Sequence, residues 1–188
     1  DYENALPLYK EAYQLALEHK SIELQQVSGI MLIKYLCGAG YYSESLEYYN
    51  KIKPEIAFNP SMQNEVVKSY MELNKPDSGR VYLAERLLLE GGDKIFLNCM
   101  MAETYIPEGQ EDSVFVFLDR AMKSYKEKAK NYQKQGREAI LPNCFLSPCY
   151  LFADLLWKKG KVQQANQYYT FVEPLMKEVV RTPIQMEF

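Results

Sequence analysis

The sequence has few of the residues that metal sites and many active sites require. Its 188 residues include one histidine, one tryptophan and four cysteines, and no two cysteines form a CxxC pair. Because zinc sites are built mainly from paired cysteines and histidines, we expect no metal site. Glycine and proline number nine each, too few for a collagen-like or linker sequence. We interpret the cysteines as small buried hydrophobic residues, and they are Cys37, Cys99, Cys144 and Cys149.

Long apolar runs and an excess of basic charge are also missing. The best apolar run, from Gly29 to Gly40, is interrupted by Lys34 and Gly38, whereas a membrane helix needs about 20 apolar residues. The first residues, Asp1 to Asn4, lack the basic start and apolar stretch of a signal peptide. A net charge of −3 provides no electrostatic footprint for nucleic acid or for an anionic membrane. We therefore expect this segment neither to insert into a membrane nor to bind nucleic acid, and we favour a cytoplasmic over a periplasmic location.

No sequence motif assembles a catalytic site. The single histidine, His19, lies in a polar stretch, and no motif supplies it with a nucleophile or an orienting partner. The two glycines between Glu90 and Asp93 do not form a phosphate-binding loop and are typical of a helix cap and turn. Carboxylates such as Glu108 and Glu111 are interpreted as solvated charge. We predict that the chain is not an enzyme and needs no cofactor.

The sequence does contain a repeated spacing of residue types. Gly40 is followed by an aromatic residue after two positions, a small one after five, an aromatic one after nine and an apolar one after twelve. Gly160 begins the same series, with Val162 in place of the first aromatic residue. Shifts of 34 and then 35 residues keep this register through the middle of the chain. The next interval, from Val114 to Ala165, is 51 residues, which predicts an extended helix over Lys123–Arg137 followed by an insertion at 138–148.

Each unit of this spacing predicts two antiparallel helices. The first helix carries apolar residues at helical spacing, as between Val27 and Leu36, and ends at a glycine such as Gly40 or Gly160. Small residues indicate that the second helix crosses its partner closely, and they are Ser45, Gly79 and Ala165. Candidate helix starts are Ser43 and Asp77 for second helices, and Asn59–Pro60 and Ser147–Pro148 for first helices.

The spacing resembles the tetratricopeptide repeat, a helix–turn–helix unit of 34 residues that stacks into a right-handed superhelix. The resemblance is carried most clearly by Leu32, Leu36, Gly40, Tyr42, Ser45 and Tyr49, and by Phe152, Ala153, Leu156, Gly160, Val162, Ala165 and Tyr169. It implies an all-α fold, a right-handed α-α superhelix (TPR-like solenoid) of about five antiparallel helix pairs. This would be a single domain over residues 1–188 and a fragment of a longer protein, with units at about 1–20 (partial), 21–58, 59–92, 93–137 and 138–182.

In tetratricopeptide repeats the first helices line a concave groove. Its positions carry over by register from four residues taken as equivalent core positions, Leu32, Val66, Met101 and Phe152. The implied groove residues are Ile30, Lys34, Asn64, Lys68, Cys99, Glu103, Tyr150, Asp154 and Trp157. The groove would be basic in its N-terminal half and acidic in its C-terminal half, where Glu103 and Asp154 would repel the carboxylate of a chaperone C-terminus. A mixed-charge segment with an apolar anchor near Trp157 fits better, and the alternative is a groove filled by the chain's own neighbouring segments.

The resemblance implies a protein–protein interaction module that binds a peptide or protein segment in its concave groove. The tyrosine pairs at 41–42, 48–49 and 168–169 also resemble the repeat segments of Bacteroidetes sensor kinases and transcriptional regulators. This second resemblance implies the sensory or regulatory part of a larger signalling or transcription-regulator protein. The alternative is a small-ligand or peptide-effector sensor domain coupled to an attached output domain. Neither the identity of the partner nor the oligomeric state follows from the sequence.

The abundant tyrosines and a lysine-rich run have structural interpretations. Six of the 16 tyrosines fall on the repeated spacing, and we assign them to packing between helices. They are Tyr9, Tyr42, Tyr49, Tyr70, Tyr105 and Tyr169. Their neighbours Tyr48 and Tyr168 face another direction, and we expect them at the surface. The lysine-rich run from Lys123 to Arg137 is interleaved with tyrosines, as nucleic-acid patches are. Because Glu127 interrupts the run and the whole chain is acidic, we interpret it as the solvated face of one long helix.

Overall fold

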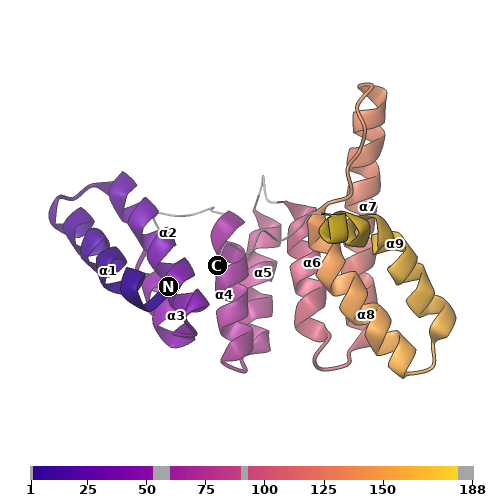
Figure 1. The fold of residues 1–188 in the computed structure, drawn as a ribbon, viewed down its shortest axis with the longest axis horizontal. Coiled ribbons are helices and arrows are strands. Elements are labelled where there is room, and N and C mark those ends of the chain that lie inside the picture. Colours follow the sequence, from indigo (N-terminus) through magenta and orange to yellow (C-terminus); the bar gives the residue numbers. More distant parts are fainter. Residues whose placement is uncertain (1, 53–59, 90–92, 182–188) are drawn as a thin grey trace. The chain divides into compact units, whose positions relative to one another are not determined.

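The computed structural model describes residues 2–52, 60–89 and 93–181, and these residues contain nine α-helices, one short 3₁₀-helix and no strand. The predicted all-α class is confirmed for this part of the chain (Figure 1). The elements are α1 (Tyr2–Glu18), α2 (Ile22–Gly38), α3 (Tyr42–Ile52), α4 (Pro60–Glu72), α5 (Pro76–Leu88), α6 (Lys94–Tyr105), α7 (Glu111–Lys134), η1 (Asn143–Phe145), α8 (Leu146–Lys158) and α9 (Val162–Arg181).

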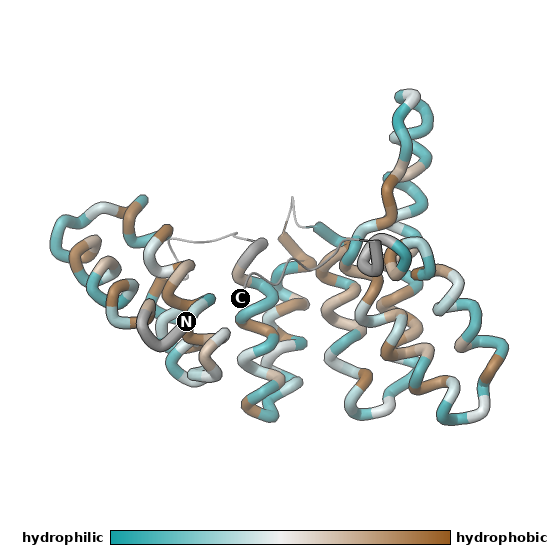
Figure 2. The backbone as a smooth tube through the Cα atoms, viewed as in Figure 1, coloured by the Kyte–Doolittle hydropathy of each residue, from teal (hydrophilic) through white to brown (hydrophobic). Residues whose placement is uncertain are grey.

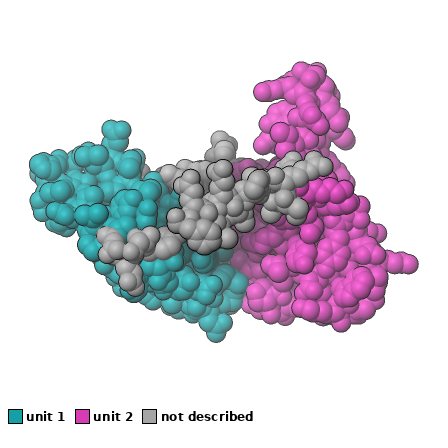
Figure 3. All heavy atoms as spheres, in the orientation of Figure 1, with its two compact units in different colours: residues 1–82 teal, residues 83–188 magenta. Residues whose placement is uncertain are grey.

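The chain divides into two compact units, residues 1–82 and 83–188 (Figure 3). In unit 1, α2 packs against both α1 and α3, and α4 packs against α2 and α3. In unit 2, α6 packs against α7, η1 and α8, and α8 packs against α9. Within each unit, these helices that follow one another in the sequence are neighbours in space, as a helical repeat requires.

The turns that end the first helices share one backbone geometry. Gly40, Asn74, Gly109 and Gly160 follow α2, α4, α6 and α8, and each has a positive φ, from 54° to 84°. The N–H of the next residue reaches back to a carbonyl in the last turn of the helix, as in the 2.9 Å bond from Tyr41 to Leu36. This is the Schellman motif, which glycine and asparagine favour because they tolerate a left-handed backbone. The repeated turn explains the repeated spacing in the sequence.

The small residues of the repeat lie where two helices approach closely. Ser45 in α3 is buried, and its hydroxyl donates a hydrogen bond of 3.2 Å to the carbonyl of Ile33 in α2. A Cβ placed on Gly79 of α5 would lie 3.5 Å from the Cβ of Tyr70 in α4. Ala165 in α9 is fully buried. The predicted close crossings are confirmed, and the four equivalent core positions are also buried: Leu32, Val66, Met101 and Phe152.

Several predicted helix starts need correction. Helix α4 begins at Pro60 as expected, whereas Asn59 lies outside the described residues. Helices α3 and α5 begin at Tyr42 and Pro76, so that Ser43 and Asp77 lie inside the first turn rather than before it. Helix α8 begins at Leu146, directly after η1, so Ser147–Pro148 also lies within its first turn. The 3₁₀-helix η1 continues directly into α8, and no side chain caps the start of α8.

The predicted extended helix is confirmed, since α7 has 24 residues and its partner α6 has 12. The C-terminal half of α7 projects beyond α6 and α8 within unit 2 (Figure 1) and is mainly hydrophilic (Figure 2). The insertion that follows it contains η1, which packs against α6. The longer interval in the repeat thus comes from extra turns of α7 and from this insertion.

Cysteines and tyrosines mostly pack as expected. All four cysteines are free thiols, and three are buried while Cys144 is half-buried. Tyr49 contacts Tyr82 edge-on, with ring centroids 5.7 Å apart. The expectation that Tyr168 lies at the surface is wrong, because its ring packs edge-on against Phe152 at 5.0 Å and burial raises its pKa to about 12. Tyr168 is partly buried against the core of unit 2, to which α6, α7, η1, α8 and α9 all contribute.

Candidate functional site

A cavity of about 390 Å³ in unit 1 brings together three of the predicted groove residues, Lys34 on α2 and Asn64 and Lys68 on α4. Asn64 and Lys68 are four residues apart, so they lie on the same face of α4. Because α2 and α4 pack against each other, this face meets the side of α2 that carries Lys34. The complete lining is Met31, Lys34, Tyr35, Cys37, Gly38, Asn64, Glu65 and Lys68.

The charged groups of this cavity are largely uncompensated. Among the described residues, no carboxylate lies within ion-pair distance of the Lys34 or Lys68 ammonium. The Oε2 atom of Glu65 is buried and has no hydrogen-bond partner among the same residues. A buried polar atom without a partner is costly. The cavity therefore offers two cations to a ligand.

The wall on the α2 side is apolar and held in place from two directions. The ring of Tyr35 stacks on that of Tyr9 in α1, with centroids 4.5 Å apart and planes tilted by 30°. A hydrogen bond between the two hydroxyls raises the pKa of Tyr9. The thiol of Cys37 donates a hydrogen bond of 3.6 Å to the carbonyl of Glu65, and burial raises the pKa of this thiol. Cys37 is thus a protonated structural residue rather than a nucleophile.

Only part of this lining was predicted from the repeat register. The predicted groove positions lie two residues before and two or five residues after the core position, whereas Met31 and Tyr35 flank Leu32 by one and three residues. Ile30 is half-buried on α2, one turn before Lys34. Glu65 lies between Asn64 and the buried core residue Val66. A carboxylate next to a core position is the sequence signal that could have identified it. A full helical face, rather than selected positions, would have included these residues.

The predicted groove residues on α6 do not form a surface site. Cys99 is only 1% exposed and belongs to the core of unit 2, so the expectation that it lines a groove is not met. It contacts Cys144 of η1, because that element packs against α6. Glu103, one turn further, is half-buried, and burial raises its pKa while a hydrogen bond from Ser147 acts in the opposite direction. The insertion after α7 thus covers the side of α6 where the groove was expected.

The predicted residues on α8 form an exposed strip. Tyr150, Asp154 and Trp157 are spaced by four and three residues and therefore share one face of the helix. Tyr150 contacts the ring of Tyr169 at 5.6 Å, and Asp154 forms an ion pair of 2.6 Å with Lys158. The Trp157 side chain is 51% exposed, which is unusual for the largest apolar side chain. The strip combines an aromatic surface with one carboxylate.

Comparisons with known proteins assign no family. The chain matches no protein-family model, and no curated protein or solved structure is significantly similar to it. The tetratricopeptide resemblance therefore stays a prediction. Within the described residues, no group of His, Cys, Asp and Glu side chains is arranged to hold a metal ion. No helix in that same part is both long enough and apolar enough to cross a membrane.

Proposed function

We propose that the chain is a TPR-like right-handed solenoid, without catalytic activity of its own, that binds a protein or peptide segment. The proposal is supported by the Schellman turns that follow α2, α4, α6 and α8. It is also supported by the small residue five positions after three of these turns, at Ser45, Gly79 and Ala165. By resemblance, this binding serves the sensory or regulatory part of a larger signalling protein. The binding surface is the cavity between α2 and α4.

The observation that carries the proposal is the convergence of Lys34, Asn64 and Lys68 on one cavity. These residues come from α2 and α4, two successive first helices, and the tetratricopeptide resemblance had implied that they line one groove. Lys34 and Lys68 carry like charges at one cavity, and no described carboxylate, Glu65 of the lining included, lies within ion-pair distance of either lysine. This arrangement favours an external anion. The contact of Tyr9 with Tyr35 holds one wall in place before any ligand arrives.

The chemistry of the cavity defines the segment that fits it. Lys34 and Lys68 attract a carboxylate side chain. Met31 and Tyr35 add an apolar wall for an aliphatic or aromatic side chain. A short segment with one acidic residue and one apolar residue fits both features.

A peptide selection tests this surface. We would select binders of the full chain from a random-peptide phage library and measure their affinity by fluorescence anisotropy. Lys34→Glu with Lys68→Glu is expected to weaken binding at least about tenfold, because it reverses both charges that face the ligand. The matched control is Lys126→Glu with Lys130→Glu, which makes the same charge change on exposed positions of α7.

If the Lys34 and Lys68 variant binds the selected peptides as tightly as the unchanged chain, the cavity is not the binding surface. If both double variants weaken binding equally, the effect is one of net charge, and the cavity assignment is again wrong. Circular dichroism of each variant establishes that the helix content is retained.

A further inference from the structure

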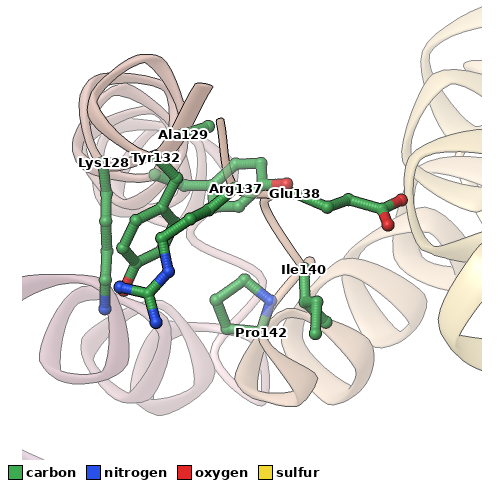
Figure 4. A pocket seen from close by; sticks show the side chains of 8 residues that line it. Lys128, Ala129, Tyr132, Arg137, Glu138, Ile140 and Pro142 are labelled. Atoms are coloured by element: carbon green, nitrogen blue, oxygen red, sulfur yellow. The ribbon is translucent and has the colours of Figure 1, made fainter. Parts of the chain in front are cut away.

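A second cavity, of about 300 Å³, lies in unit 2 where the chain leaves the end of α7 (Figure 4). Gly136 has a φ of 67° and ends the helix in a Schellman turn, which directs the chain back along α7. The returning segment is held by Tyr125, whose hydroxyl donates a hydrogen bond of 3.4 Å to the carbonyl of Ala139. The cavity lies between this segment and the last turns of the helix.

The Schellman turn also builds one wall of the cavity. The N–H of Arg137 bonds to the carbonyl of Tyr132 at 2.9 Å, and the guanidinium of Arg137 lies 5.8 Å from the centroid of the Tyr132 ring. This contact holds a planar cation against an aromatic ring. Apolar side chains complete the lining from both sides, and Ile140 among them is 76% exposed. These residues are Ala129, Ile140 and Pro142.

The two cations of this cavity have no acidic partner. Among the described residues, no carboxylate lies within ion-pair distance of Lys128 or Arg137. Glu138 is the one acidic residue of the lining, and in Figure 4 its side chain extends away from the side where Lys128 and Arg137 lie. Two positive charges thus border one concave surface that also has aromatic and aliphatic walls.

We propose that this cavity binds a small free molecule in which an aromatic ring carries a phosphate monoester. A phosphate monoester has a second pKa of about 6 and is mainly a dianion at pH 7, so its charge matches Lys128 and Arg137 together. The ring packs against Tyr132 and the apolar lining. A cavity of about 300 Å³ has the size of a small-ligand site and holds one ring with its phosphate.

The test uses phenyl phosphate as the probe and isothermal titration calorimetry on the full chain. We expect saturable binding with one site per chain. Lys128→Gln and Arg137→Gln are each expected to weaken it about tenfold, as for the loss of one charge-assisted hydrogen bond. Lys126→Gln, an exposed position of α7 outside the cavity, is the matched control and is expected to leave the affinity unchanged. Circular dichroism verifies that each variant is folded.

Further ligands separate the roles of the ring and the phosphate. Benzyl alcohol and inorganic phosphate are each expected to bind more than tenfold more weakly than phenyl phosphate, and Tyr132→Leu is expected to remove that preference over inorganic phosphate. Equal affinity for inorganic phosphate would overturn the proposal in favour of a simple anion site. Absence of phenyl phosphate binding, or unchanged binding in the Arg137→Gln variant, would also overturn it. If a short phosphotyrosine peptide bound about ten times more tightly than phenyl phosphate, the assignment to a small free molecule would be overturned.

Discussion

Replacing glycine by alanine is expected to have opposite effects on stability at two positions of unit 1. Gly79 lies inside helix α5, where a Cβ would meet the Cβ of Tyr70 at 3.5 Å, an ordinary van der Waals contact. Alanine at such a position gains about 1 kcal/mol from helix propensity. Gly40 has a φ of 84°, and a Cβ there would have no neighbour within 4 Å. The change at Gly40 therefore acts through the backbone alone.

The magnitude at Gly40 follows from two terms of opposite sign. A left-handed backbone costs a residue with a Cβ roughly 1–2 kcal/mol, and the smaller conformational freedom of the unfolded chain returns about 0.4–1 kcal/mol. Gly40→Ala is thus expected to lower the free energy of unfolding by about 1 kcal/mol, and Gly79→Ala to raise it by a similar amount. The two variants would differ by about 2 kcal/mol.

Urea unfolding followed by circular dichroism at 222 nm measures this difference. Both positions belong to unit 1, so the same unit reports on both variants. We expect the unfolding midpoint to rise for Gly79→Ala and to fall for Gly40→Ala. A loss of stability in Gly79→Ala would show that α4 and α5 are closer than described. An unchanged midpoint in Gly40→Ala would show that the turn after α2 is not left-handed.

Two further predictions concern unit 2. Brief treatment of the native protein with iodoacetamide is expected to modify Cys144 before Cys149. Cys144 is half-buried and its hydrogen bond with Cys99 lowers its pKa, whereas Cys149 is buried and its pKa is raised to about 12. Equal modification of the two thiols, measured by mass spectrometry, would contradict this. Glu103→Gln is expected to stabilise the protein at pH 7 but not below pH 4.5. Burial raises the pKa of Glu103, so the stability that its protonated form contributes is lost as the pH rises through that raised pKa. Equal thermal stability of the variant and the unchanged protein at pH 7 would refute this prediction.

The repeat itself could be predicted from sequence because its signals are local. Gly40 and Gly160 mark turns that need a positive φ, and the small residues after them mark helix crossings. The corresponding turn after α4 is formed by Asn74, which has a φ of 54°, so a search for glycine alone misses it. Asparagine serves there because its short polar side chain tolerates the left-handed backbone. Spacing therefore located these turns better than residue identity did.

The error at Cys99 has a different origin. Helix α6 is buried on most of its circumference, so its hydrophobic pattern does not distinguish a groove face from a core face. The face that the register assigned to a groove is covered by η1, which belongs to an insertion more than 40 residues later. Such a contact between distant segments leaves no local signal in the sequence. The cavity beside α7 was missed for the same reason, because it depends on where the chain returns after Gly136.

Hydrogen–deuterium exchange with a selected peptide tests the proposed binding surface most directly. We expect the peptide to slow exchange in α2 around Lys34 and in α4 between Asn64 and Lys68, because these segments line the cavity. The Lys34→Glu, Lys68→Glu variant should lose this protection while its exchange without peptide stays the same. Protection confined to α7, α8 or α9, with α2 and α4 unchanged, would contradict the assignment of the binding surface to unit 1.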